Sequence, residues 1–343
     1  MKKKYFHFLV LLSCFLILVA TTGCNQKEEK VIHSDLVFPV DKEVELEMII
    51  DDPIMPAVVS DIDLYNGKLV LSYRMNDRHI HFFDAESGEE LGSSINIGQG
   101  PGEMIYLNKF SLDRKTGTFT AYDWIAYQLF SGNIDSLFNG ASPSPVNEDF
   151  GSAYSVFPLP QGYFYYQPPY NADKERRYFL KKRDGEVVKY EGYPYDDFQL
   201  LVNIASSYKV GFFKDGTKMV AATCPGLIME FFDLRNGIEK TQTRYFRKIF
   251  LRNDDSPDFD RSGGIFDLYC TDNFIYGTFL DPNDSRINNI VIFDWEGNPM
   301  KIFRTKYKAL HNICVDDEER FLYVIGEDND GIYFLAKLDL TKY

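Results

Sequence analysis

The feature that most constrains the fold is a strand–turn–strand unit that recurs six times along the 343 residues. Each copy holds a short apolar strand, a turn with polar residues, glycine or proline, and a second apolar strand. The copies are residues 61–71, 110–122, 156–166, 210–220, 268–276 and 313–323. Their starts lie roughly 45 to 55 residues apart, and such a period built only from strands is typical of radially repeated sheets. The pattern therefore predicts a β-propeller.

A second alternating segment follows each unit and runs into a turn, in most copies one where Asp or Gly supplies local hydrogen bonds or a positive φ. These segments are residues 79–88, 127–132, 178–185, 228–237, 290–297 and 333–340. About 300 residues over six units gives roughly 50 per unit, a normal size for a four-stranded blade. We therefore predict an all-β domain over residues 43–343: a six-bladed β-propeller of four-stranded antiparallel blades.

The ring needs a closing strand, because the sixth unit shows only three strand-like segments before Tyr343. The apolar, alternating segment 43–50 lies before the first unit and has no partner there. An unpaired sheet edge invites aggregation, and ring closure removes it. We expect residues 43–50 to form the outermost strand of the sixth blade.

The N-terminus has the features of a targeting segment. Three lysines at positions 2–4 precede an apolar run over residues 6–20, which is too short to cross a bilayer comfortably. Small residues then lead to Cys24. Residues 1–23 resemble a bacterial lipoprotein signal peptide, which implies cleavage before Cys24 and acylation of its thiol, for example with palmitate. The alternative is an ordinary secretory peptide with a chance cysteine.

Residues 24–42 are predicted to be a flexible tether, since the polar run 25–30 has nothing to bury. This run resembles the lysine-plus-acid signals of surface-displayed lipoproteins in Bacteroides-type bacteria. The resemblance implies an outer-membrane protein, lipid-anchored and displayed at the cell surface. A solvated linker without any address is the alternative.

Charge excludes one class of partner. Removing the three leader lysines from 37 basic residues leaves 34 against 51 acidic residues, a formal charge of −17. Such a surface repels nucleic acid and anionic headgroups.

Aromatic residues make up 16% of the chain, which suits half-buried strands, and no long window has a helical apolar period.

Cysteine usage indicates packing residues and gives no sign of a metal centre. Beyond the leader and Cys24 the chain holds Cys224, Cys270 and Cys314, with no C-x-x-C or zinc spacing. Cys270 and Cys314 occupy matching places in successive units, normally too far apart for a disulfide. We expect all three to be small buried hydrophobic residues.

The most distinctive short string is Gly-Gln-Gly-Pro-Gly-Glu at residues 98–103, which predicts a tight turn between two units. With the six repeats and the leader, it resembles the TolB-like six-bladed β-propeller lipoproteins of Bacteroides-type bacteria. In that family the element recurs where one blade passes to the next. The resemblance spans nearly the whole mature chain and carries over no catalytic residue.

Histidines and acids offer few metal ligands. His79 and His81 alternate along one predicted strand and could reach a common ion, but no third ligand can be named, so a solvent-facing pair is expected. The acid clusters fall mostly where the repeat needs turns, and none matches a twelve-residue calcium loop. The sequence therefore predicts no metal site and no cofactor; the alternative hypothesis is a structural calcium ion near the channel mouth.

Loops rich in tyrosine and proline are the candidate recognition surface. They contain Tyr170, Tyr193 and Tyr195, whose rings could stack on sugars. No Ser/His/Asp order, nucleophile elbow or phosphate-binding loop is present, so catalytic residues stay unassigned.

The sequence favours a non-enzymatic module that is held by the membrane through a lipid anchor and binds a protein or a glycan. The alternative is a hydrolase or lyase that acts on a carbohydrate or lactone through carboxylates at the propeller axis; a third interpretation is a structural partner in an envelope complex. Fold alone does not separate these interpretations. An enzyme requires two or more acids or histidines to converge, poorly solvated, in one axial pocket. A structural partner would instead show an exposed apolar patch.

Overall fold

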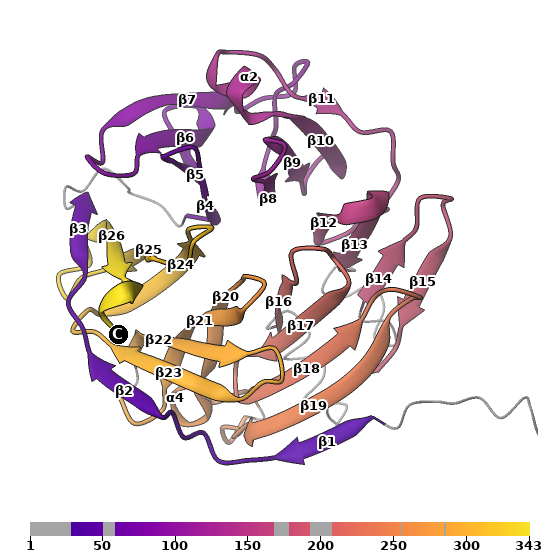
Figure 1. Ribbon diagram of the computed structural model, residues 1–343. Helices are drawn as coiled ribbons and strands as arrows, with labels where there is room; N and C mark the ends of the chain where they lie inside the picture. The colour runs from indigo at the N-terminus through magenta and orange to yellow at the C-terminus, as the bar shows by residue number, and fades with distance from the viewer. Residues whose placement is uncertain (1–28, 51–58, 168–177, 193–207, 255, 285) are drawn as a thin grey trace, which may run out of the picture.

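Six blades of β-strands stand around a central axis in the computed structural model (Figure 1), and one parallel bridge between Ile287 and Ala309 joins the last two. The structure describes residues 29–50, 59–167, 178–192, 208–254, 256–284 and 286–343. The predicted six-bladed propeller of four-stranded antiparallel blades is confirmed. No helix in these ranges is both long and apolar enough to cross a membrane.

The blades follow one another along the chain. Blade 1 contains β4 (Asp61–Tyr65), β5 (Lys68–Met75), β6 (Arg78–Asp84) and β7 (Glu90–Asn96). Blade 2 contains β8 (Leu107–Asp113), β9 (Thr118–Asp123), β10 (Gln128–Asn133) and β11 (Ser144–Pro145), with α2 (Ile134–Phe138) after β10. Blade 3 contains β12 (Ser155–Leu159), η1 (Pro160–Gly162), β13 (Tyr163–Gln167), β14 (Tyr178–Lys181) and β15 (Val187–Tyr190).

The second half repeats the arrangement. Blade 4 contains β16 (Tyr208–Phe212), β17 (Lys218–Thr223), β18 (Leu227–Asp233) and β19 (Glu239–Arg247), followed by α4 (Phe259–Ser262). Blade 5 contains β20 (Gly264–Cys270), β21 (Phe274–Asp281), β22 (Arg286–Asp294) and β23 (Pro299–Arg304). Blade 6 contains β24 (Ala309–Val315), β25 (Phe321–Glu327), β26 (Tyr333–Asp339) and the short η2 (Leu340–Lys342).

The core lies between neighbouring blades, because each central strand is covered on both faces. Successive side chains of a strand point to opposite faces, and β5 shows the consequence. Leu69 and Leu71 pack with Ile325 of blade 6, whereas Val70 packs with Phe119 of blade 2. Alternating apolar residues therefore stabilise two different interfaces from one strand.

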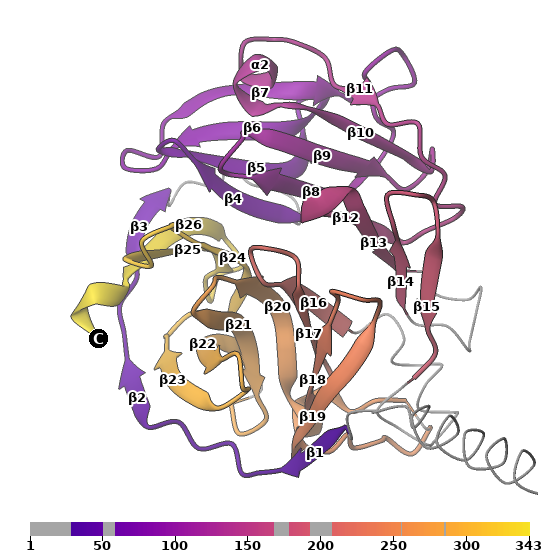
Figure 2. The same cartoon turned by 45° about the vertical axis from the view of Figure 1, so that its right-hand side comes forward.

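The chain before blade 1 forms a belt around the outside of three blades, and we call residues 29–50 the N-terminal belt (Figure 1, Figure 2). Within it, β1 (Lys30–His33) pairs in parallel with β19, and β2 (Val40–Glu43) pairs in parallel with β23. Its last strand, β3 (Glu47–Ile50), pairs antiparallel with β26. The predicted closure of blade 6 by residues 43–50 is therefore confirmed, with β3 as its fourth strand.

The prediction of a flexible tether over residues 24–42 is wrong for the part that forms β1 and β2. These strands find partners because the outermost strands of blades 4 and 5 leave one edge open. Leu36 and Phe38 pack against the core between the same two blades. The guanidinium of Arg304 donates to both carboxylate oxygens of Asp41, at 2.8 and 3.0 Å. These short segments mix apolar and polar residues, and their partner strands are distant in the chain, so the sequence did not indicate the pairing.

The Gly-rich string 98–103 connects β7 to β8, the blade-to-blade position that the sequence predicted. The Glu103 carboxylate folds back and accepts the Gly100 N–H at 2.8 Å. A Cβ on Gly100 would lie 2.9 Å from that carboxylate, and Gly102 has φ +76°. The glycines therefore serve a compact connection.

Two truncations test the belt. A chain that starts at residue 36 loses β1, but blade 4 keeps four strands of its own. A chain that starts at residue 51 also loses β2 and β3, and without β3 the β26 edge stays open in a three-stranded blade. We expect the first to stay monomeric and to melt within a few degrees of the full chain, and the second to aggregate and melt much lower, by size-exclusion chromatography and thermal denaturation. Equal behaviour of the two would contradict closure by β3.

Candidate ligand-binding pocket on the propeller axis

A cavity of about 960 Å³ lies on the propeller axis, lined by the innermost strand of every blade. These strands are β4, β8, β12, β16, β20 and β24. The cavity also takes in the turns that follow five of them, including residues 114–116, 213–215, 271–273 and 316–317. Its mouth therefore lies at the end of the propeller where the innermost strands turn into the second strands.

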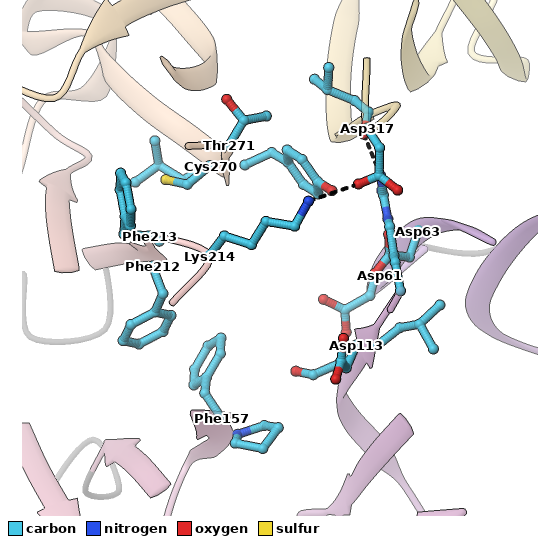
Figure 3. Close-up of a pocket in the computed structure, with 18 of the residues that line it drawn as sticks. Asp61, Asp63, Asp113, Phe157, Phe212, Phe213, Lys214, Cys270, Thr271 and Asp317 are labelled. Atoms are coloured by element: carbon cyan, nitrogen blue, oxygen red, sulfur yellow. Dashed lines mark hydrogen bonds and ion pairs between the residues drawn. The ribbon is translucent and has the colours of Figure 1, made fainter. Parts of the chain in front are cut away.

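The cavity has an aromatic wall and an acidic wall (Figure 3). Phe157 of β12 and Phe212 of β16 pack together with ring centroids 5.4 Å apart, and Phe213 extends the same wall. Asp61 and Asp63 of β4 lie across from them. The two walls come from different blades, so only ring closure brings them face to face.

Asp61 is tied to the neighbouring blade. Its carboxylate accepts the Phe110 N–H at 2.8 Å and forms an ion pair with the Lys109 ammonium. Burial raises the pKa of the Asp61 carboxyl, and the charge of Lys109 offsets this only in part. The Lys109 ammonium also lies 5.1 Å from the centre of the Phe157 ring, so it spans both walls.

Arg114, in the turn after β8 of blade 2, contacts three other blades at the acidic wall. Its Nε donates to Asp63 at 2.7 Å and its Nη1 donates to the Val315 carbonyl of blade 6 at 2.6 Å. The guanidinium lies 5.4 Å from the ring centre of Tyr269 in blade 5. Burial alone would lower the pKa of Arg114, but the Asp63 charge outweighs it and raises the pKa. Arg114 is thus a permanent cation held in place.

Asp267 of β20 is the carboxyl in the cavity that is poised to titrate. Its Oδ2 accepts the Ile313 N–H at 3.1 Å. Burial raises the pKa of Asp267 to about 6, and the positive charges of Lys209 and Lys109 offset only part of that effect. Near neutral pH this side chain can hold or release a proton.

Asp61 and Asp267 also stabilise the fold, because each makes an equivalent contact to its neighbouring blade. Each lies on an innermost strand and accepts a backbone N–H from the innermost strand of the next blade. A buried N–H needs such an acceptor. The residues that line the cavity therefore also join the blades.

The structure describes some of the site residues that the sequence analysis predicted and leaves others outside the described ranges. Cys24, Tyr170, Tyr193 and Tyr195 lie outside the described residues. Asp61 and Asp63, at the start of the first repeat unit, reach the axis. The cavity residues Lys109, Arg114, Asp267, Phe157 and Phe212 were not predicted; their shared signal is a place on or just after the first strand of a repeat unit.

The expectation of a solvent-facing His79 and His81 is wrong, because β6 is covered by blades on both faces and both side chains are buried. His79 Nε2 lies 3.0 Å from the Met104 carbonyl, and His81 Nδ1 lies 3.1 Å from the Glu90 carboxylate. Across the part of the chain that the structure describes, no group of three or more His, Cys, Asp or Glu side chains is arranged to hold a metal ion.

The turn acids shape turns as predicted, and Cys224 and Cys314 are buried as predicted, whereas Cys270 is half-buried and lines the cavity. Asp316 accepts the N–H groups of Arg320 and Phe321 at 2.7 and 2.9 Å, so it shapes its turn. Cys224, Cys270 and Cys314 are free thiols, Cys270 half-buried and the other two buried. Burial raises the pKa of Cys224 to about 12, which makes it a packing residue.

Comparison with known proteins supports the architecture. The sequence model of a family described as a 6-bladed beta-propeller matches residues 51–246, more than half of the chain. No curated protein matches in sequence.

Three solved structures are similar in fold. A Bacteroides fragilis protein whose name marks it as exported has a TM-score of 0.56 at 12% identity, over 90% of this chain and 99% of that one. A gluconolactonase from Xanthomonas campestris has a TM-score of 0.54 at 11% identity, over 85% and 88%. Regucalcin, a calcium-binding protein from Agrobacterium tumefaciens, has a TM-score of 0.51 at 12% identity, over 90% and 95%. At these identities the likeness concerns the fold alone.

Asp267→Asn tests the electrostatics of the cavity. Between pH 4 and 6 the folded protein keeps a proton on Asp267 that the unfolded chain releases, so this group lowers stability as pH rises through that window. Asparagine stays neutral and still accepts the Ile313 N–H. We expect the variant to gain about 1 to 2 kcal/mol of unfolding free energy at pH 7.5 and nothing at pH 4, by urea denaturation.

Asp63→Asn is the matched control. It removes the charge from a carboxylate that already binds Arg114, so it should lower stability at pH 7.5. A loss of stability in Asp267→Asn at pH 7.5 would show that Asp267 is not the disfavoured charge.

Proposed function

For this member of the DUF5128 family of six-bladed β-propellers, we propose the role of a ligand-binding module whose axial cavity receives the ligand. We further propose that the protein is an envelope-anchored lipoprotein. The observation that carries the proposal is the pairing of an aromatic and an acidic wall in one cavity of about 960 Å³. Cavities of this size hold small molecules or a few residues of a partner. Their polar groups fix orientation, and their apolar wall contributes most of the affinity.

The chemistry of the lining favours a ligand with a flat apolar face and positive or hydroxyl groups. Among the described residues that line the cavity, nine are acidic and four are basic. Three of these bases, Lys109, Arg114 and Lys214, already contact lining carboxylates, with Lys214 3.3 Å from Asp317. The excess of acidic over basic side chains suits a partner segment with Lys or Arg beside an aromatic residue, or a glycan whose hydroxyls donate to the carboxylates.

The leader and the belt support the anchor. Four residues separate Cys24 from Glu29, where the belt begins on the outside of blade 4. An acyl group on Cys24 would therefore hold the propeller by its rim, close to the outer membrane. The exported protein from Bacteroides fragilis is in keeping with a location in the envelope.

A hydrolase or lyase is the second candidate, favoured by one observation. Asp61 and Asp267 both lie in the cavity with a raised pKa, and the charge of Asp61 adds to the rise at Asp267. Two poorly solvated carboxyls in one pocket meet the criterion that the sequence set for an enzyme. Against it, both acids already accept a backbone N–H from the next blade.

Phe212→Ala tests binding in the cavity. The probes are an arginine–tyrosine dipeptide, spermidine, cellohexaose and maltohexaose, measured by titration calorimetry. We expect at least one to bind and the variant to bind it about tenfold more weakly, since an aromatic contact is lost. Phe266→Ala, which removes a half-buried ring outside the cavity, is the control. Failure of all four probes would count against the proposal, and hydrolysis of glucono-1,5-lactone that disappears in Asp267→Asn would favour the enzyme.

Cys24→Ser tests the anchor. Without the thiol no acyl chain can be attached, so the protein should move from the membrane to the soluble fraction of the envelope and lose palmitate labelling. Protease treatment of intact cells reports whether the wild-type protein is displayed outside. Membrane association that persists in Cys24→Ser would overturn the lipid anchor.

A further inference from the structure

A cluster of exposed aromatic side chains lies far from the axial cavity, at the junction of blades 2 and 3. Tyr106 is 45% exposed, Trp124 36% and Tyr154 41%, although large aromatic side chains are usually buried. Ile125 and Tyr127, each 51% exposed, continue the cluster along the turn after β9. We call these five residues the aromatic platform.

The platform lies at the opposite end of the propeller from the cavity mouth. Leu107, at the start of β8, pairs with Asp123 at the end of β9, so Tyr106 and Trp124 lie at the same end of this hairpin. The other end, where Asp113 pairs with Thr118, belongs to the cavity mouth. The axial ligand and a platform ligand would therefore occupy different faces.

The three central rings are interlocked. Trp124 meets Tyr106 and Tyr154 edge to face, with ring centroids 6.1 and 6.0 Å apart and interplanar angles of 67° and 72°. Edge-to-face pairs are favourable and fix the orientation of each ring. Trp124 is thus held between two tyrosines from different loops.

A buried carboxylate holds the backbone under the platform. Asp123 is 1% exposed and accepts N–H groups from both loops: Ile105 at 2.6 Å and Tyr106 at 3.3 Å, and Ile125 at 2.9 Å and Ala126 at 3.0 Å. These bonds join the loop before β8 to the turn after β9. They build the site before any ligand arrives, which lowers the entropic cost of binding.

The backbone at the third ring is held by blade 2 and by blade 3. The Asn108 side chain donates to the Tyr154 carbonyl at 2.6 Å, and the Tyr122 hydroxyl donates to the Ala153 carbonyl at 2.9 Å. The Tyr154 N–H donates to the Gln167 carbonyl at 2.8 Å. The backbone that carries Tyr154 is therefore held from both sides of the junction between blades 2 and 3.

We propose that the aromatic platform is a second binding site, for a carbohydrate chain. Ring faces of Trp and Tyr present flat apolar surfaces, and the tyrosine hydroxyls can donate to and accept from sugar hydroxyls. The five side chains carry no charge in a protein of formal charge −14, which suits a neutral polysaccharide.

Size argues against a protein partner. Aromatic side chains present about 150 to 250 Å² each, so four aromatic rings and one isoleucine, each about half exposed, offer roughly 400 Å². A standard protein interface needs about 800 Å² from each partner. The platform matches the footprint of a few sugar rings.

The experiment is affinity electrophoresis of the full-length protein in native gels that contain xylan, mannan, soluble β-glucan or glycogen. We expect at least one polysaccharide to retard the protein and the apparent affinity to fall at least tenfold in Trp124→Ala and in Tyr154→Ala. Thermal melting of each variant establishes that it is folded. Tyr343→Ala, which removes an exposed tyrosine elsewhere, should keep wild-type retardation, and Phe212→Ala in the cavity reports whether a polysaccharide binds there instead.

Each other outcome overturns the proposal. No retardation by any of the four polysaccharides, or retardation that folded Trp124→Ala and Tyr154→Ala retain, would exclude the platform as a glycan site. Loss of an envelope protein from pull-downs with Trp124→Ala, without any gel retardation, would assign the surface to a protein partner. Retardation lost only in Phe212→Ala would place glycan binding in the axial cavity.

Discussion

The pairing of β3 with β26 is the contact on which the rest of the molecule depends. It joins a strand near the start of the chain to a strand near its end, so six repeats become a ring. Without it the last blade has three strands and an open edge. Ring closure also brings the aromatic wall of blades 3 and 4 opposite the acidic wall of blade 1, and a cavity with two chemistries results.

The belt extends the same principle. A closed ring of blades still has an outer edge on every blade, and β1 and β2 cover two of these edges in parallel register. The Arg304–Asp41 pair holds the belt in place, and Arg304 also donates to Asp281 within blade 5 at 3.1 Å. A pull on a lipid anchor placed before this segment would act on the outer strand of blade 4, where β1 pairs with β19.

Acids at the axis have two roles that pull in different directions. Asp61 and Asp267 accept backbone N–H groups between blades, yet burial disfavours their charge. Such groups often mark functional sites, because a ligand can neutralise a charge that the fold tolerates poorly. A cationic or hydroxyl-rich ligand would relieve this cost, whereas the uncharged aromatic platform on the other face suits a neutral polysaccharide.

The sequence by itself determined the six repeats, the four-stranded blades and the closing strand, because strand alternation and turn residues are local signals. It also placed the Gly-rich string between two blades and the acids in turns. It could not show which loops meet: Asp123 joins residues 105 and 106 to residues 125 and 126, and Trp124 lies between tyrosines 18 residues before and 30 residues after it in the chain. Only the tertiary structure decided that the histidines of β6 are buried, that the belt pairs with distant edges and that residues from six repeats share one cavity. Those outcomes depend on contacts between blades, which have no period along the chain.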